Sequence, residues 1–478
     1  MAYVITQSCC VDASCVAACP VNCIHPTPGE PGFGTTEMLF IDPAACVGCG
    51  NCVGACPVGA IANESSLMPT QLPFAELNRT YYDEFPHDDR PILSPLTPQR
   101  RLRAGGPFRI AVIGAGPAGM FAADELLKHP EIAAVDVFER QSTPYGLARR
   151  GVAPDHTDTK KVADLFAAIE AQPRFAYHFG VSVGTDITID ELRSRYNGVI
   201  VAVGAPADRR LLIPGEDLRG SLAATQVVGW YNGDPDHADV DVPLTHNRAV
   251  VIGNGNVALD VARMLTRDPE WLETHTDIAS GALGELYGST VDEVVVLGRR
   301  GPADAAFTVP ELIGLSTLTD VDVVVDAEPD TLTGADTRSR LLRELAERPQ
   351  PSTPGVTRIV LRFATTPIEI IGDGHGVTGV RVANTGHDDA DEIIDAGLVV
   401  RAIGHRGRPV TGLPFDEVTG TIPNDRGRVE PGVYVTGWIK RGPRGFIGTN
   451  KTCAEETVGA VLDDLERVGP PLHDAVSR

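Results

Sequence analysis

The sequence predicts an α/β fold in which two Rossmann-like units follow a small, cysteine-rich α+β domain. Three observations lead to this prediction. Nine of the ten cysteines lie within the first 56 residues. Two apolar stretches, one beginning at Phe108 and the other at Arg248, each lead into a glycine-rich turn. With 478 residues, the chain is long enough for about three domains.

The cysteine-rich domain, expected over residues 1–64, contains Cys46, Cys49, Cys52 and Cys56, followed by Pro57. This C-x2-C-x2-C-x3-C-P spacing is typical of iron–sulfur proteins, in which the first three thiolates bind one cluster and the fourth binds another. A disulfide framework is disfavoured because nine is an odd number. A zinc site is disfavoured because three successive cysteines share the same two-residue interval.

An incomplete copy of this run comes earlier in the chain, where Cys15 and Cys19-Pro20 keep only its closing part. If the last cysteine of each run binds the cluster of the other run, one [4Fe–4S] cluster is expected to be bound by Cys19, Cys46, Cys49 and Cys52. The other cluster is expected to be bound by Cys15, Cys56 and either Cys9 or Cys10. Three ligands suit a [3Fe–4S] cluster, whereas a fourth from that last pair, or from Cys23, would allow [4Fe–4S].

The composition argues against some partners. The chain has 41 Lys and Arg against 64 Asp and Glu, a net charge of −23 at pH 7, which disfavours binding to nucleic acid or to anionic membranes. The segment before Arg79 contains no Lys or Arg. This acidic surface is either an ordinary solvated face or a surface that docks on a basic partner. There is no 18-residue apolar run and no basic signal-peptide start. We therefore expect a cytoplasmic protein.

Residues 65–106 are expected to form a Pro-rich linker. Seven prolines occur between positions 69 and 107, and they are expected to interrupt any helical or strand period. Proline favours extended backbone, so the linker is expected to run along the surface of the next domain.

The first glycine-rich turn contains Gly114, Gly116 and Gly119 and lies between an apolar strand and a helix. The next strand ends on Glu139. Glycines let the backbone approach a pyrophosphate at a helix N-terminus, and the acid binds ribose hydroxyls. We expect a dinucleotide with an unphosphorylated ribose here, in a domain formed by residues 107–206 and 396–470, before a tail at 471–478.

The second turn has a G-x-G-x-x-A pattern that begins at Gly253, and the following strand ends in Arg299 and Arg300 instead of an acid. Two guanidinium groups bind a 2′-phosphate that a carboxylate would repel. Residues 207–395 are therefore expected to form an NADP(H)-binding domain, inserted into the first unit and joined to it by a two-strand hinge.

The combination of two dinucleotide sites and iron–sulfur clusters suggests a flavoprotein. A flavin accepts two electrons as hydride and releases them singly, which is the conversion needed between a nicotinamide and clusters. We therefore expect FAD in the first unit, with electrons passing from NADPH to FAD and then to the clusters.

Five short sequence motifs occur in a characteristic order, and they begin at Pro144, Val201, Gly253, Gly298 and Gly437. On these motifs, residues 107–470 resemble the adrenodoxin-reductase-like family of ferredoxin–NADP reductases, which has a glutathione-reductase-like fold. Residues 1–64 resemble bacterial seven-iron or eight-iron ferredoxins, although the segment from Cys9 to Cys15 departs from both. The tandem resembles the ferredoxin-fused members of the reductase family.

The resemblance implies which residues hold the cofactors. For FAD these are Gly114, Gly116, Pro117, Ala118, Gly119, Glu139, Arg140, Leu147, Val183, Gly437, Trp438, Gly445, Phe446 and Ile447. For NADP(H) they are Gly253, Asn254, Gly255, Asn256, Val257, Arg299, Arg300 and Glu311. The catalytic pair is expected to be His156 and Glu311, which would orient the nicotinamide without exchanging protons with it.

The predicted function is that of a ferredoxin–NADP(+) reductase with its own ferredoxin domain, which relays electrons from NADPH to an external acceptor, either a ferredoxin or a cytochrome P450-type enzyme. One alternative is an electron-input subunit of a glutamate-synthase-like complex, which the tight cysteine run disfavours. Another is a non-enzymatic iron–sulfur redox sensor, which would have little use for the arginine pair and the flavin-closing motif at Gly437.

Overall fold

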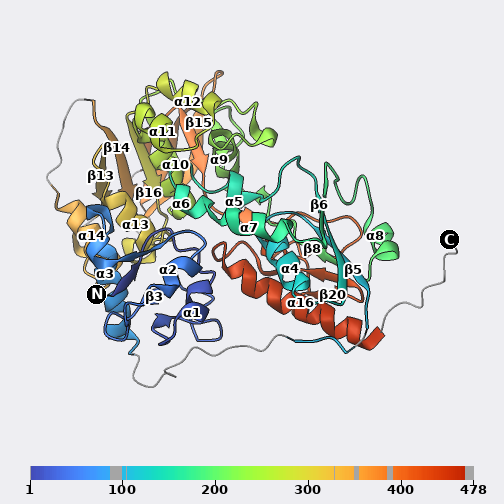
Figure 1. Cartoon of the computed structure of the whole chain (residues 1–478). Helices are drawn as coiled ribbons and strands as arrows, with labels where there is room; N and C mark the ends of the chain where they lie inside the picture. Colours follow the sequence, from blue (N-terminus) through green and yellow to red (C-terminus); the bar gives the residue numbers. More distant parts are fainter. Residues whose placement is uncertain are drawn as a thin grey trace.

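The computed structural model describes residues 2–86, 100–103, 105–327, 329–348, 355–384 and 391–468. The predicted tail and part of the predicted linker lie outside these residues. Figure 1 shows three bodies: an N-terminal domain in blue, a first unit in teal and red, and a second unit in yellow-green and orange. None of the described helices is both long and apolar enough to span a membrane.

The N-terminal domain has two short antiparallel pairs of strands and two short helices. Strand β1 (Tyr3–Ile5) pairs antiparallel with β4 (Ile61–Asn63), and β2 (Ile24–His25) with β3 (Phe40–Ile41). Helices α1 (Ser14–Ala18) and α2 (Asn51–Ala55) pack on each other. Each helix begins after a residue of left-handed backbone and ends at the cysteine that precedes a proline. The two halves of this domain are therefore built in the same way.

Helix α3 (Leu72–Glu84) lies where we expected a linker without regular structure, so that expectation was wrong for these residues. Two of the prolines, Pro69 and Pro73, occur in the first turns of η2 (Pro69–Gln71) and α3, where the missing N–H would have no partner in any case. The buried amide of Asn78 accepts from the backbone N of Ile5 (3.2 Å) and of Ile41 (2.9 Å). Helix α3 is therefore part of the N-terminal domain.

The first unit is a six-stranded sheet in the order β20-β21-β8-β5-β6-β7, parallel except for β20. Its strands are β5 (Phe108–Ile113), β6 (Ile132–Glu139), β7 (Phe175–Phe179), β8 (Gly198–Val201), β20 (Arg428–Glu430) and β21 (Val433–Val435). Long helices α4 (Pro117–Leu127) and α16 (Thr449–Val468) pack side by side. The shorter helices are α5 (Leu147–Arg150), α6 (Thr157–Lys160), α7 (Val162–Glu170), α8 (Ile189–Arg195) and α15 (Trp438–Arg441).

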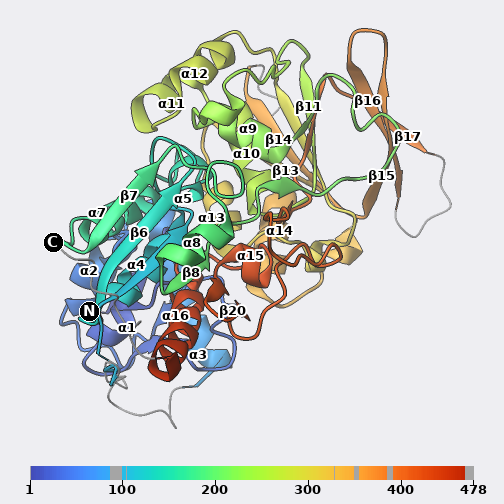
Figure 2. The same ribbon diagram turned by 90° about the vertical axis from the view of Figure 1, so that its right-hand side faces the viewer.

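The second unit is a parallel sheet in the order β10-β18-β11-β12-β14-β13. Its strands are β10 (Ser221–Ala223), β11 (Arg248–Ile252), β12 (Glu293–Leu297), β13 (Val321–Asp326), β14 (Thr357–Arg362) and β18 (Leu398–Arg401). Its helices are α9 (Ala224–Tyr231), α10 (Asn256–Thr266), α11 (Pro269–His275), α12 (Ser280–Tyr287), α13 (Val309–Ser316) and α14 (Thr337–Ala346). Figure 2 shows a separate antiparallel sheet at its outer edge, made of β15 (Thr365–Gly372), β16 (Val377–Asn384) and β17 (Glu392–Asp395).

Both parallel sheets have central strands that are buried on both faces, and they read as continuous apolar runs for that reason. In β5, the residues from Ile110 to Val112 are fully buried. The remaining short elements are the 3-10 turns η1 (Glu64–Ser66), η3 (Pro235–His237), η4 (Pro302–Asp304) and η5 (Pro329–Thr331).

Two features mark where the chain passes between the units. Strands β9 (Ala207–Asp208) and β19 (His405–Arg406) pair antiparallel and form the two-strand connection that we predicted. Strand β18, however, pairs with β10 and β11 of the second unit. The return to the first unit therefore comes after Arg401, and the boundary that we expected at residue 396 is too early.

Candidate functional site

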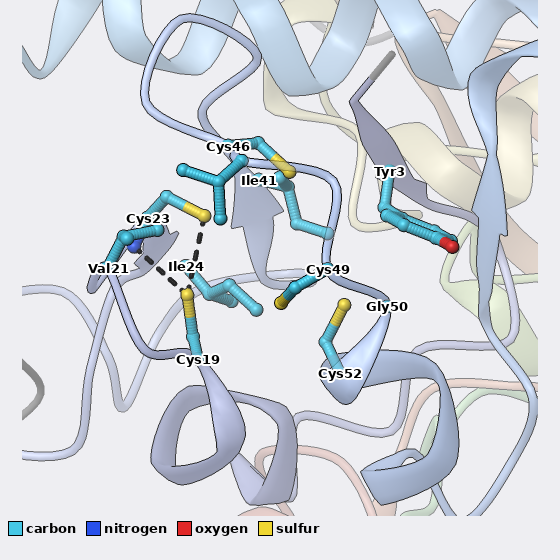
Figure 3. A pocket seen from close by; sticks show the side chains of 11 residues that line it. Tyr3, Cys19, Val21, Cys23, Ile24, Ile41, Cys46, Cys49, Gly50 and Cys52 are labelled. Atoms are coloured by element: carbon cyan, nitrogen blue, oxygen red, sulfur yellow. Dashed lines mark hydrogen bonds between the residues drawn. The ribbon is translucent and has the colours of Figure 1, made fainter.

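Four of the predicted cluster ligands surround one small pocket in the N-terminal domain (Figure 3). It is lined by Cys19, Cys46, Cys49 and Cys52, together with apolar side chains that include Ile24 and Ile41. Cys49 and Cys52 belong to the turn and first residues of α2, and Cys19 ends α1. Thiolates from these positions, in an apolar shell, fit the ligand set of a [4Fe–4S] cluster.

Cys23 also lines this pocket, and its Sγ lies 3.4 Å from Cys19 Sγ. The hydrogen bond between them lowers the pKa of the Cys19 thiol and raises the pKa of Cys23. The site thus has five thiols where four ligands suffice. The sequence left Cys23 as a possible fourth ligand of the other cluster, whereas the structure places it beside this one.

The other predicted ligands, Cys9, Cys10, Cys15 and Cys56, interact electrostatically with one another. Burial raises the pKa of Cys9 to about 12 and also raises that of Cys10 and Cys15. Backbone N–H groups of Leu39 and Val11 donate toward the Cys9 sulfur. The Cys10 sulfur lies 3.9 Å from Asp12 Oδ1. Buried thiols held in one group fit a second cluster.

The group of Cys9, Cys10, Cys15 and Cys56 lies against the first unit. The backbone N of Gly448 donates to the carbonyl oxygen of Cys10 at 2.7 Å, and Lys451 Nζ donates to the carbonyl oxygen of Asp12 at 3.3 Å. A Cβ on Gly448 would lie only 2.2 Å from the backbone N of Asp12. The cysteine loop therefore contacts the segment that follows the predicted FAD residues Phe446 and Ile447.

The predicted FAD turn has the geometry that a pyrophosphate requires. Gly114 has φ +102°, and a Cβ on Gly119 would lie 1.9 Å from the Gly114 carbonyl oxygen. The space beside Gly116 is open within 4 Å, and helix α4 begins at the next residue, Pro117. Glu139 Oε2 accepts from the backbone N of Ala115 at 2.9 Å. The acid thus lies at the turn, as a ribose-binding carboxylate would.

The other residues predicted to hold FAD surround this turn or lie at the edge of the sheet. Gly437 has φ +75°, and a Cβ added to it would lie against the side chain of Ala118. The ring centroid of Trp438 lies 5.3 Å from that of His405. Gly445 has φ +81°, Leu147 is exposed at the start of α5, and Val183 lies beyond the end of β7. Arg140 forms an ion pair with Asp236 of the second unit, so this side chain connects the two units.

The predicted NADP(H) turn opens helix α10. Gly253 has φ +112°, a Cβ on it would lie 2.3 Å from the Ala402 carbonyl oxygen, and the space beside Gly255 is open. Asn256 exchanges two hydrogen bonds with Thr308, one from the Thr308 backbone N at 2.8 Å. Asn254 packs near Gly298 at the end of β12, and Val257 is half-buried. The turn is thereby joined to the start of α13.

Arg299 and Arg300 follow β12 and are both exposed. Arg300 Nη1 lies 3.8 Å from Asp304, a weak pairing between two groups that are each 61% exposed. Both residues are thus exposed and close in sequence to the end of β12, next to the glycine-rich turn, a position that suits the binding of a phosphate.

His156 and Glu311, the predicted catalytic pair, come from different units and meet with 3.7 Å between Nε2 and Oε2. Arg263 joins them: it lies 2.8 Å from His156 Nε2 and 3.4 Å from Glu311 Oε2. It also forms ion pairs with Asp155 (2.9 Å) and Asp260 (2.7 Å). All of these groups are buried or nearly so.

Sequence reasoning missed Arg263, Asp155 and Asp260. A usable signal was present, because Asp260 and Arg263 are charged residues three apart in a largely apolar helix. Burial opposes the charge of Asp155, but Arg263 lowers its pKa to about 2. Burial raises the pKa of Asp260 to about 6, even with Arg263 beside it.

Comparisons with known proteins agree with this arrangement. The family model for a pyridine nucleotide-disulphide oxidoreductase matches residues 108–268, and that for a 4Fe-4S binding domain matches residues 39–62. The chain is 50% identical to a probable ferredoxin/ferredoxin–NADP reductase of Mycobacterium leprae, over 97% of this chain and 86% of that protein. It is 47% identical to the NADPH-ferredoxin reductase FprA of Mycobacterium tuberculosis, over 75% of this chain and 84% of that protein.

A solved structure supports the same assignment. The structure of Mycobacterium tuberculosis FprA in complex with NADPH is similar with a TM-score of 0.72 and 45% identity, covering 76% of this chain and 85% of that one. The chain therefore belongs to the adrenodoxin-reductase-like family of ferredoxin–NADP reductases, which are NADPH-dependent flavoprotein oxidoreductases, and carries a ferredoxin domain fused to its N-terminus.

Proposed function

We propose that this reductase sends electrons from its flavin-binding unit through its own ferredoxin domain to an acceptor protein. In this proposal, bound FAD supplies the conversion between the two-electron hydride of NADPH and the one-electron steps of the clusters. The first cysteine group, with Cys9, Cys15 and Cys56, receives the electrons. The second cysteine group, with Cys19, Cys46, Cys49 and Cys52, delivers them to the acceptor.

The observation that carries this order is the contact between Gly448 and Cys10. The hydrogen bond of 2.7 Å between their backbones brings the first cysteine group against the Phe446–Gly448 segment, which is proposed to close over FAD. Cys15 of this group and Cys52 of the second group lie on helices α1 and α2, which pack on each other. The chain thus offers a continuous route from the flavin-binding unit through both cysteine groups.

The second cysteine group lies nearer to solvent and is proposed as the exit. Cys49 is exposed, and the neighbouring side chains of Val47 and Val53 are 63% and 38% exposed. The domain around them has no Lys or Arg before Arg79. An acceptor with an apolar contact and a basic rim, such as a ferredoxin-type partner or a cytochrome P450-type enzyme, would complement this surface.

For the clusters, we propose [4Fe–4S] at the exit and [3Fe–4S] at the entry. Cys9, Cys15 and Cys56 would be the three ligands of the entry cluster. The Cys10 thiol is directed to Asp12 (3.9 Å) and packs in the core of the first unit, which supports a structural role. Cys23 would remain an additional thiol at the exit cluster. Reduced thiolates are needed throughout, which supports the cytoplasm as the compartment.

For the nucleotides, we propose that the Gly114–Gly119 turn and Glu139 hold FAD, with the remaining predicted residues around them. The Gly253–Val257 turn would bind the NADP(H) pyrophosphate, and Arg299 and Arg300 its 2′-phosphate. His156 and Glu311 would orient the nicotinamide, since Arg263 holds both side chains at the junction of the two units. Hydride transfer itself requires no proton from either residue.

The entry route can be tested with Gly448→Ala in the holoenzyme. The added Cβ would lie 2.2 Å from the backbone of Asp12 and must push the cysteine loop away. Reduction by NADPH should bleach the flavin at the wild-type rate, whereas freeze-quench EPR should find the clusters reduced more slowly. Gly459→Ala is the matched control, because it adds the same methyl group to α16 in open space. If the clusters of Gly448→Ala were reduced after the flavin at the wild-type rate, this route would be contradicted.

A further inference from the structure

Two side chains of the ferredoxin domain reach helix α13, the helix that carries Glu311. Gln7 Nε2 donates to Glu311 Oε2 at 3.3 Å. A Cβ on Gly314 would lie 2.4 Å from the same Gln7 nitrogen, so the amide lies directly on the helix between Glu311 and the next turn. In Figure 1, α13 lies at the boundary between the second unit and the blue N-terminal domain.

Glu37 of the ferredoxin domain contacts the start of the same helix. Its Oε2 accepts from the backbone N of Val309 at 2.7 Å, and its Oε1 accepts from Arg338 Nη2 at 3.1 Å. The first backbone N–H groups of a helix have no partner within the helix. Within α13, Thr308 caps the N of Glu311. The N-terminus of α13 is therefore capped partly by Thr308, which directly precedes the helix, and partly by Glu37, which lies 272 positions away in the sequence.

These contacts supply what the buried cluster around Glu311 lacks. Arg263 is shared among Asp155, Asp260 and Glu311, and its distance to Glu311 is the longest of the three. Gln7 adds a neutral donor to Glu311, so it can hold the carboxylate in one orientation without changing the charge of the cluster. A hydrogen bond to a charged, buried acceptor is among the stronger ones in proteins.

We propose that Gln7 and Glu37 are positioning residues of the NADPH site: the fused ferredoxin domain sets the orientation of Glu311 and so takes part in hydride transfer as well as in accepting electrons. The inference rests on the proposed role of Glu311 toward the nicotinamide. It makes the reductase half-reaction depend on how the ferredoxin domain is docked, through contacts that do not involve the clusters.

The test uses the holoenzyme variants Gln7→Leu and Glu37→Ala. Anaerobic stopped-flow reduction of the flavin by NADPH separates the limiting rate from the NADPH dissociation constant. Titration with NADP+ records the change in the flavin absorption spectrum, which reports the placement of the nicotinamide without turnover. We expect the limiting rate to fall about tenfold, the shape of the difference spectrum to change, and the dissociation constant to stay within about twofold.

Two further variants sharpen the test. Glu37→Gln keeps an oxygen that can accept from Val309 and should restore much of the wild-type rate. Glu76→Gln removes an exposed ion pair with Arg340 of α14 at the same domain interface and should behave as wild type. If Gln7→Leu loses iron, the Glu37→Ala variant carries the test.

Three outcomes would overturn the inference: wild-type rates and spectra in both Gln7→Leu and Glu37→Ala, equal slowing in Glu76→Gln, or loss of iron in both principal variants. Glu311→Gln distinguishes this failure from that of the proposed function. If Glu311→Gln reduces as wild type does, the role of Glu311 itself is wrong; if it is slow while Gln7→Leu is not, only the present inference fails.

Discussion

Arg263 of α10 and Asp155 of the first unit form an ion pair of 2.9 Å in which the side chains are only 3% and 7% exposed. The pair joins the two nucleotide-binding units at the point where His156 and Glu311 meet. Because Arg263 also contacts Asp260 and Glu311, one guanidinium is shared by three carboxylates. The orientation of the proposed nicotinamide site therefore depends on a residue that is outside both glycine-rich motifs.

Replacing this guanidinium should be costly. We expect Arg263→Met to lower the free energy of unfolding by about 3–5 kcal/mol, because it leaves buried carboxylates without their partner. Urea denaturation, followed by circular dichroism, measures the change. Lys161→Met, which breaks an exposed ion pair with Asp158, should change it by less than about 1 kcal/mol. If both variants lost a similar amount of unfolding free energy, the buried ion pairs of Arg263 would stabilise the protein no more than an exposed ion pair does.

The pKa of Asp260 predicts a dependence of stability on pH. Burial raises this pKa from 3.8 to about 6 in the folded state, so the folded protein binds a proton that the unfolded chain has released. Its contribution is fully present below pH 3.8 and is lost as the pH rises through 6. We expect this group to remove about 1–2 kcal/mol between pH 5 and 7.

Asp260→Asn should remove the part of the pH dependence of the unfolding free energy that comes from this carboxyl group. The free energy of unfolding, measured from pH 5 to pH 7 for both proteins, should fall more steeply in the wild type. Asp158→Asn, on the exposed surface, serves as the control for a lost carboxylate. Parallel slopes for wild type and Asp260→Asn would rule out the assigned pKa.

The double variant with Arg299→Ala and Arg300→Ala should lose its preference for NADPH. Each charge-assisted hydrogen bond to a phosphate contributes about 1.5–3 kcal/mol, so kcat/KM for NADPH should fall about 100-fold or more, mainly through KM. The value for NADH, which lacks the phosphate, should change little. Arg381→Ala, in the outer sheet of the same unit, is the control. An equal loss with both nucleotides would refute the assignment.

Cys10→Ser and Cys15→Ser should behave differently. Cys10 is directed to Asp12 and packs in the core, so its replacement should leave the iron content and the oxidised-state EPR signal unchanged. Cys15→Ser should remove the entry cluster and its signal, with the exit cluster retained. If Cys10→Ser loses iron as Cys15→Ser does, Cys10 is a ligand and the entry cluster is of the four-iron type.

Local spacing made several parts of this molecule predictable. The glycines of the two turns lie where the backbone adopts positive φ or approaches another strand closely, as at Gly114 and Gly253, and only glycine tolerates such positions. The grouping of the cysteines was also predictable, because the short intervals around Cys46 leave few ways to surround a cluster. The two-strand hinge followed from the insertion of one unit into the other.

Other parts depend on residues that are distant in the sequence. Prolines near residue 70 predicted a linker, yet α3 forms because Asn78 binds the backbone of β1 and β3, and no local pattern reports such a partner. Strand β18 joins the second sheet because its backbone pairs with β10 and β11. A strand with an apolar sequence fits either sheet until its neighbours are known.

The sequence by itself thus determined which groups are available for the proposed chemistry: thiolates for iron, two glycine-rich turns for dinucleotides and an arginine pair proposed to bind a 2′-phosphate. Only the tertiary structure decided how these parts work together, through Arg263 between the two units, Gly448 against Cys10, and Gln7 and Glu37 on α13. The reason is physical. Motifs arise from backbone geometry within a few residues, whereas orientation between domains arises from side-chain contacts that span up to several hundred residues.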